Sequence, residues 1–131
     1  PIDAKKNVIL VRQYRSAVRE MLLEIPAGKI EPGEELLQCV RRELEEETGY
    51  LAQKIEALGG FYAGPGYTTE YLYLYLATHL QPSNEAGGSD EIMEQVRVPL
   101  AKIPELIASG EIRDAKSVAG LLRVILERRR E

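Results

Sequence analysis

The feature that most constrains this chain is a short segment that carries all of its net negative charge. Residues 31–47 contain seven glutamates and two arginines, a local charge of −5, whereas the rest of the 131-residue chain sums to +1. A block of like charge either faces solvent as an ordinary charged helix or attracts cations. The spacing of its members decides between these two interpretations.

Apolar residues within the segment predict a helix over about residues 34–48. On a helical wheel these residues fall on one side and form a stripe that we expect to be buried. Cys39 lies near that side, where a small buried or half-buried residue fits. Gly49 follows at the position that favours a left-handed C-terminal cap. The predicted stripe comprises Leu36, Leu37, Val40 and Leu44.

Glutamates on this helix divide into two groups. Glu43 and Glu47 lie one turn apart on the core side, with Glu46 at its edge, and they would repel each other unless a proton, an arginine or a metal lay between them. Oxygen ligands without a nearby histidine favour Mg²⁺ or Mn²⁺, and Mg²⁺ often binds substrate phosphates. We therefore predict a phosphate-handling metal site. The residues expected to face solvent are Glu34, Glu35, Glu45 and Arg41.

The remaining patterns predict a single α/β domain over residues 1–131, with a sheet between helices. Tyrosines 71, 73 and 75 alternate with leucines, which predicts an internal strand covered on both faces. Strands are expected at 7–14, 21–25, 55–62, 70–80 and 94–100, and further helices at 103–109 and 117–129.

The composition argues against several kinds of metal site, cellular location and binding partner. Its one cysteine and one histidine allow no internal disulfide, no thiolate zinc cluster and no multi-histidine metal site. No apolar run spans a bilayer and no signal-peptide pattern occurs, so we expect a cytoplasmic protein without a membrane partner. Outside the acidic block the chain is nearly neutral, which argues against a nucleic-acid partner.

Residues 28–50 resemble the signature of the Nudix hydrolases. Gly28, Glu34 and the run RELEEETG from Arg42 to Gly49 match G-x5-E-x7-R-E-U-x-E-E-x-G-U at every fixed position, and only the final aliphatic position departs, as Tyr50. The resemblance implies an α/β/α sandwich with a mixed β-sheet, in which residues 28–50 form the catalytic loop and helix. It also implies Mg²⁺-dependent hydrolysis of a nucleoside diphosphate linked to another group.

The resemblance also implies roles for individual residues. Arg42 would orient a carboxylate, Glu34 would support the loop and helix, and Gly28 would allow close backbone approach. The base that activates water would be Glu91, with Glu94 as an additional metal ligand; the competing assignment makes Glu46 or Glu47 the base. The implied metal ligands are Glu43, Glu46, Glu47, Glu94 and the backbone carbonyl of Ala27.

Segments outside this signature resemble the ADP-ribose pyrophosphatase subgroup. They are residues 24–34, 64–70 and 110–122, together with Pro65 sixteen residues after Gly49. The subgroup implies cleavage of ADP-ribose to AMP and ribose 5-phosphate. The alternatives are another nucleoside diphosphate sugar, a dinucleotide, or a non-catalytic module that binds a nucleotide-derived metabolite. The implied substrate residues are Arg15, then Arg12 as a weaker choice, with Glu24, Pro65, Gly66 and Glu70.

The same subgroup implies a homodimer. Its members commonly carry a segment before the first strand that helps to form the dimer and the adenine pocket. In this chain the first strand begins within about seven residues, so either the subgroup's dimerisation and adenine recognition do not carry over or the site is more open than in those enzymes.

Overall fold

The computed structural model describes residues 1–84 and 93–130. Its strands and helices follow the predicted order, although β3 begins at Tyr50, five residues earlier than expected. The elements are β1 (Asn7–Arg15), β2 (Glu20–Glu24), α1 (Leu36–Thr48), β3 (Tyr50–Tyr62), β4 (Tyr71–Pro82), β5 (Gln95–Pro99), a 3₁₀ turn (Leu100–Lys102), α2 (Ile103–Ser109) and α3 (Ala115–Arg129).

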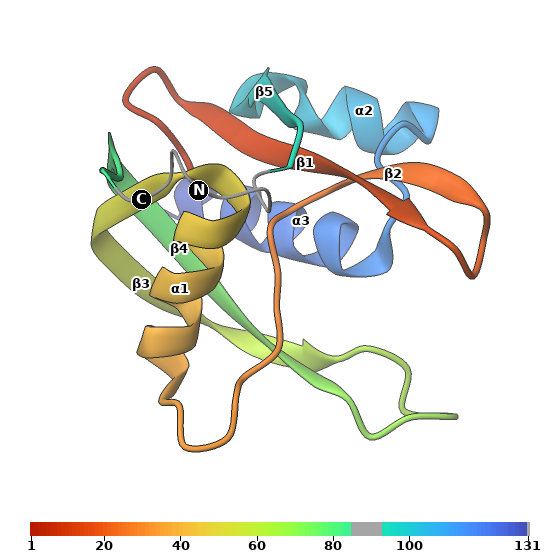
Figure 1. Ribbon diagram of the computed structural model, residues 1–131. Helices are drawn as coiled ribbons and strands as arrows, with labels where there is room; N and C mark the ends of the chain where they lie inside the picture. The colour runs from red at the N-terminus through yellow and green to blue at the C-terminus, as the bar shows by residue number, and fades with distance from the viewer. Residues whose placement is uncertain (85–92, 131) are drawn as a thin grey trace.

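These elements form layers, with α1 in front of the strands and α2 and α3 behind them (Figure 1). The predicted α/β sandwich is confirmed. The prediction of a mixed sheet is wrong for the described strands. They form a three-stranded sheet in the order β2-β1-β5 and a two-stranded sheet of β3 and β4, and every pair of strands is antiparallel. Strands joined by short hairpin connections pair antiparallel, and both β1–β2 and β3–β4 are joined in this way.

The core is built around β1, the middle strand of its sheet. Its residues Val8 to Val11 are all buried, and Val8 and Leu10 belong to one cluster with Ile103 of α2 and Leu121 of α3. The buried part of β1 ends at Val11, and Arg15 follows at the exposed end of the strand, where it pairs with Glu20 of β2. No helix in the described ranges is long and apolar enough to cross a bilayer.

The prediction that β4 is an internal strand is wrong. Among the strands of residues 1–84 and 93–130 it pairs only with β3, although its Ala77 also accepts a backbone hydrogen bond from Ile2 at 2.9 Å, and Tyr71 and Tyr73 are exposed. The ring centroids of Tyr62 and Tyr71 are 4.9 Å apart, those of Tyr71 and Tyr73 are 5.1 Å apart, and both pairs meet edge to face. Tyrosine tolerates this half-exposed position because its ring packs on neighbours while its hydroxyl reaches water.

Helix α1 buries a different set of residues from the predicted stripe. Leu44 and Cys39 are buried as expected, but Leu37 is 47% exposed. Burial in α1 is confined to residues between Cys39 and Thr48, so its first turn projects beyond the core. The buried set includes Glu47, as the helical wheel predicted.

Candidate active site

The loop before α1 folds back against the glutamates of the helix. The backbone N–H of Ala27 donates to Glu47 Oε2 at 3.0 Å. At Gly28 an added Cβ would lie 1.8 Å from Glu43 Cδ, so no side chain fits there. The helix itself ends at Gly49, whose φ of 76° is the left-handed conformation that the sequence predicted.

Arg42 is the central cation of this segment. Its Nε and NH2 donate to the two oxygens of Glu34 at 2.8 and 3.0 Å, and its NH1 donates to Glu43 at 2.7 Å and Glu46 at 3.1 Å. The guanidinium lowers the pKa of Glu34 to about 2. Glu34 is therefore paired rather than directed to solvent, which corrects the wheel and agrees with the support that the family resemblance implies.

Within residues 1–84 and 93–130, Glu47 has no such cationic partner. Its side chain is 5% exposed, and burial followed by the neighbouring charge of Glu43 raises its pKa to about 7. A buried carboxylate beside a second carboxylate is costly unless a proton or a cation compensates it. A proton or a cation bound at Glu47 would therefore stabilise this arrangement.

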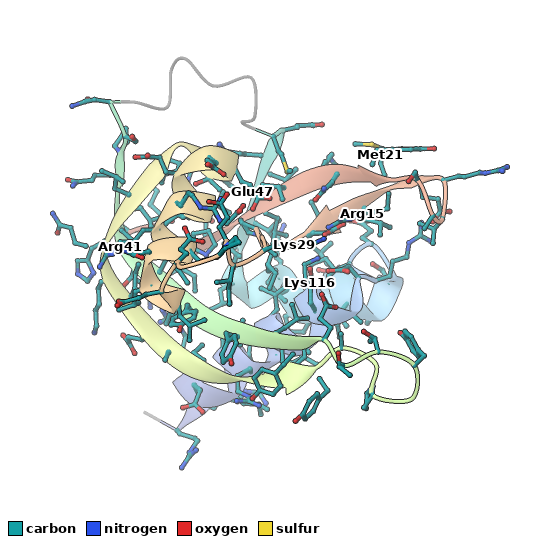
Figure 2. The ribbon with its side chains drawn as sticks, turned by 60° about the horizontal axis from the view of Figure 1, so that its bottom comes forward. Arg15, Met21, Lys29, Arg41, Glu47 and Lys116 are labelled. Carbon is teal, nitrogen blue, oxygen red and sulfur yellow. The ribbon has the colours of Figure 1, made fainter. Side chains whose placement is uncertain are left out.

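A hollow of about 340 Å³ opens at these glutamates. It brings together four of the five predicted metal-binding residues, and Arg15 approaches the same region from β1 (Figure 2). The residues around it are Gln13, Arg15, Ala27, Glu43, Glu46, Glu47 and Met93.

The chemistry of this hollow suits a divalent cation. Its carboxylates are the hard oxygen donors that Mg²⁺ and Mn²⁺ prefer, and the unmet charge of Glu47 fits a bound ion. In the described part of the chain, no three acidic, histidine or cysteine side chains are grouped as a metal centre. Arg42 draws Glu43 and Glu46 to its NH1, so a metal here requires these carboxylates to exchange Arg42 for the ion.

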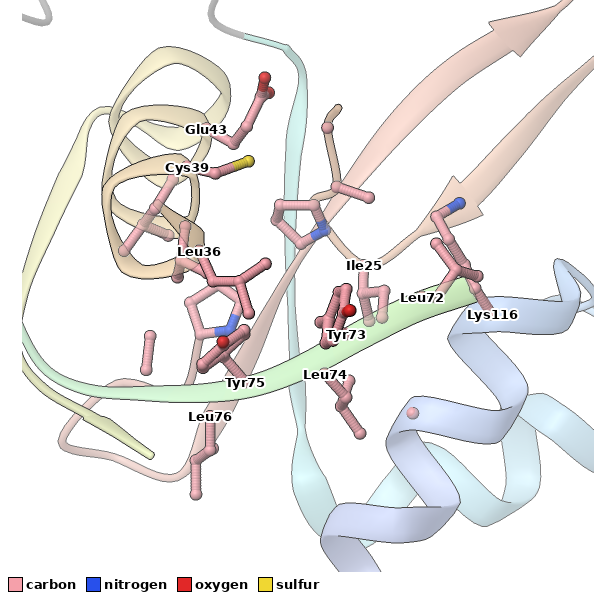
Figure 3. Close-up of a pocket in the computed structure, with 18 of the residues that line it drawn as sticks. Ile25, Leu36, Cys39, Glu43, Leu72, Tyr73, Leu74, Tyr75, Leu76 and Lys116 are labelled. Atoms are coloured by element: carbon pink, nitrogen blue, oxygen red, sulfur yellow. The ribbon is translucent and has the colours of Figure 1, made fainter. Parts of the chain in front are cut away.

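A second hollow, also about 340 Å³, lies beside the first and is largely apolar. Figure 3 shows Leu36 and Cys39 of α1 opposite Tyr73 and Tyr75 of β4, with Lys116 on the wall from α3. Glu43 lines both hollows. The acidic site and the apolar space are therefore adjacent at this residue.

The remaining predicted residues are placed differently. Arg15 donates to Glu24 in a bidentate pair, and Glu24 is 1% exposed, so it contacts an arginine rather than an open cleft. Glu94 is 66% exposed on its side chain and pairs with Arg12 at 3.5 Å. Met93 lines the acidic hollow, whereas the neighbouring Glu94 does not. As a metal ligand Glu94 stays a prediction that this arrangement does not favour.

Glu91, the predicted base, lies outside the described residues. Pro65, Gly66 and Glu70 belong to the exposed loop between β3 and β4, and of these only Glu70 lines a hollow, the apolar one. The structure does not bring Pro65 or Gly66 to the glutamates.

Sequence reasoning missed Lys116, which donates to Glu24 at 2.5 Å and lines the apolar hollow. One local signal was present. Asp114 precedes α3 as its N-cap and accepts from the backbone N–H of Ser117 at 3.2 Å, a pattern that fixes where the helix begins. The sequence gives no sign that this helix start meets the end of β2.

Comparison with known proteins gives consistent results. The model of the NUDIX domain matches residues 1–121. The chain is 40% identical over 113 residues to the ADP-ribose pyrophosphatase of Bacillus subtilis (85% of this chain, 61% of the relative) and 38% identical over 123 residues to the GDP-mannose pyrophosphatase of Cronobacter sakazakii (87% and 64%). It is 36% identical over 119 residues to the methanol dehydrogenase activator of Bacillus methanolicus (89% and 64%).

The fold is shared with a solved structure as well. The crystal structure of an ADP compounds hydrolase superimposes with a TM-score of 0.83 at 29% identity, covering 94% of this chain and 67% of that one. The chain spans 61–64% of the length of the three curated relatives named above. Together with the glutamate site and its glycine loop, the match over residues 1–121 shows that this chain belongs to the NUDIX domain family.

Proposed function

We propose that this protein hydrolyses the pyrophosphate of a nucleoside diphosphate sugar, with ADP-ribose as the leading substrate and AMP and ribose 5-phosphate as products. The observation that carries the proposal is the buried Glu47 beside Glu43, at a hollow that also contains Arg15. A pyrophosphate needs cationic partners, and this site combines Arg15 with Glu47, a carboxylate that has no ion pair within residues 1–84 and 93–130 and can therefore take a metal ion.

Nudix hydrolases generally use divalent metal ions. Here we propose Mg²⁺, with Mn²⁺ as a substitute, held by Glu43, Glu46 and Glu47 together with the carbonyl of Ala27. When bound, the metal would neutralise charge on the pyrophosphate and polarise its oxygens. Arg15 would bind a phosphate oxygen and orient the substrate. Water would lose its proton to Glu91 or to Glu46 or Glu47, and the two assignments remain alternatives.

Sequence identity to the relatives does not distinguish between the two candidate substrates, because the ADP-ribose pyrophosphatase is 40% and the GDP-mannose pyrophosphatase 38% identical to this chain. The subgroup likeness at Pro65 and in residues 110–122 favours ADP-ribose. Hydrolysis of GDP-mannose is the second candidate, since that relative matches 87% of this chain.

A substrate panel tests the proposal. Purified protein is incubated with ADP-ribose, GDP-mannose and a dinucleotide, each with Mg²⁺, Mn²⁺ or a chelator, and the products are separated by chromatography. We expect AMP and ribose 5-phosphate from ADP-ribose, and no product with the chelator. Faster cleavage of GDP-mannose would reassign the substrate. Tight ADP-ribose binding by calorimetry without turnover would instead indicate a binding module.

Three further features belong to the proposal. Residues 1–131 would form one domain, the protein would work in the cytoplasm, and two copies would associate as a homodimer. Light scattering after size exclusion measures the mass in solution and would contradict the dimer if only the monomer mass, about 14.7 kDa, were found.

A further inference from the structure

Outside the glutamate loop and helix, the most strongly connected group of charges surrounds Glu24 at the end of β2. Its carboxylate is almost fully buried and accepts three hydrogen bonds. Arg15 donates from Nε at 2.8 Å and from NH2 at 2.7 Å, and Lys116 donates from Nζ at 2.5 Å. Burial alone would raise the pKa of Glu24, but these donors hold it below its usual value.

The start of α3 fixes Lys116 in this group. Lys116 also donates to Asp114 at 2.9 Å, and its side chain is only 14% exposed. Next to it, the hydroxyl of Ser117 donates to Asp114 at 2.6 Å and accepts from the backbone N–H of Ile25 at 2.9 Å. Two adjacent side chains of α3, those of Lys116 and Ser117, therefore hydrogen-bond to Glu24 and Ile25 at the end of β2.

Arg15 uses only one edge of its guanidinium in this network. The edge formed by Nε and NH2 faces Glu24, whereas NH1 has no partner within residues 1–84 and 93–130. Arg15 also lines the acidic hollow with Glu43 and Glu47. Figure 2 shows Arg15, Glu47 and Lys116 reaching toward one region from three different elements. An arginine released from Glu24 would be drawn to these carboxylates and would occupy the space of the cation.

Building on the proposed function, we propose that Lys116 is a positioning residue for Arg15: it holds Glu24 in place, and Glu24 fixes the guanidinium so that its unpaired edge faces the pyrophosphate of a bound sugar nucleotide. Lys116 and Arg15 share the oxygen Oε1 of Glu24, so a shift of either cation moves the other. Four charges, two from Arg15 and Lys116 and two from Glu24 and Asp114, balance within the network.

A double-mutant cycle of Arg15 and Lys116 tests this inference. We expect Lys116→Met to lower kcat/KM by about 10- to 100-fold, since a small misplacement of a substrate contact has effects of this size. Arg15→Met should lower it at least as much, and the double variant should be no worse than Arg15→Met. Lys116→Arg should recover most of the activity. Lys54→Met is the matched control, because Lys54 forms an exposed pair with Glu56 on β3.

Several results would overturn the proposal. One is a Lys116→Met enzyme whose kcat/KM lies within about twofold of the wild type. Another is a double variant in which the two losses in kcat/KM multiply, because this would indicate a direct and independent role of Lys116. A lower melting temperature with unchanged kinetics would indicate a purely structural role. If Lys116→Met does not fold, Lys116→Gln takes its place in the cycle.

The proposed function can fail separately. A wild-type protein that cleaves no sugar nucleotide would contradict that function alone, and the same cycle would then be measured from the Kd of inorganic pyrophosphate with Mg²⁺. Coupled losses of affinity in that cycle would support the positioning role. Independent losses, or no binding by the wild type, would overturn it.

Discussion

Two ion clusters organise the candidate site, and they are built in opposite ways. In the first, one cation, Arg42, pairs with four carboxylates from the same loop and helix, those of Glu31, Glu34, Glu43 and Glu46. In the second, one carboxylate, Glu24, holds two cations, Arg15 and Lys116, from segments about one hundred residues apart. The first cluster is local in sequence, whereas the second exists only after the chain has folded.

The two clusters also differ in charge. The acidic cluster retains an excess of negative charge, which is concentrated at the buried Glu47. The cluster around Glu24 is balanced, because the charges of Arg15 and Lys116 are matched by those of Glu24 and Asp114. We infer that the acidic cluster is suited to bind a cation. The cluster around Glu24 is suited to keep its own side chains in fixed positions.

Removing the charge of Glu47 is the sharpest way to test this difference. Glu47→Gln keeps the size of the side chain and its acceptor for Ala27, but it weakens the affinity for a metal. We expect turnover to fall by about 10³-fold or more, which corresponds to at least about 4 kcal/mol. Glu45→Gln on the same helix is the control and should keep its activity. Near-normal turnover of Glu47→Gln in excess Mg²⁺ would contradict a metal role for the acidic cluster.

Breaking the balanced cluster should affect folding. Glu24→Gln leaves Lys116, which is mostly buried, without its strongest partner, and we expect a loss of about 3–5 kcal/mol in the free energy of unfolding. Urea denaturation measures this loss. The control is Glu20→Gln, because Glu20 pairs with Arg113 at the surface and such pairs contribute about 0–1 kcal/mol. Equal losses in the two variants would show that the Glu24 cluster has no special structural role.

The same contrast explains which parts of the structure were predictable. Helical periodicity located Glu43 and Glu47 on the core side, because their relation depends only on spacing within one helix. Lys116 could not be found in this way, since its partner Glu24 is 92 residues distant and only the packing of α3 against β2 brings them together. Local rules predict elements and motifs, whereas contacts between elements need the fold.

Errors at β4 and α1 have the same origin. The Tyr and Leu alternation correctly predicted a strand but not how many of its faces would be covered, which depends on what packs against it. Likewise the wheel placed Leu37 on the core side, but it did not show that the first turn of α1 projects beyond the core.

The pH dependence of stability provides a third test of the acidic cluster. In the metal-free protein the pKa of Glu47 is raised to about 7 from an ordinary value of 4.5. The folded state therefore keeps a proton that the unfolded chain has released between these pH values, so stability falls as the pH rises through this window. The loss is about 3 kcal/mol by pH 8.

Urea denaturation of metal-free protein at about pH 5 and about pH 8 measures this effect. The same measurement on Glu47→Gln is subtracted, so that the contributions of the other groups, which titrate alike in both proteins, cancel. Glu47→Gln should lack the part of the pH dependence that Glu47 causes. Saturating Mg²⁺ should restore stability to the wild type at the higher pH. A wild type with the same pH profile as Glu47→Gln would show that Glu47 titrates normally.

The smallest expected effect concerns the loop that closes on the acidic cluster. Gly28→Ala would place a methyl group 1.8 Å from Glu43 Cδ, so the loop or Glu43 must move. We expect a loss of about 1–3 kcal/mol in the free energy of unfolding, as for other overpacked sites. Gly66→Ala is the control for stability, because nothing lies within 4 Å of its added Cβ. Its stability should be unchanged or slightly increased, since alanine restricts the unfolded chain. A Gly28→Ala protein as stable as Gly66→Ala would mean that Glu43 turns away freely, and the close approach of loop and helix would then not be needed to hold the carboxylates together.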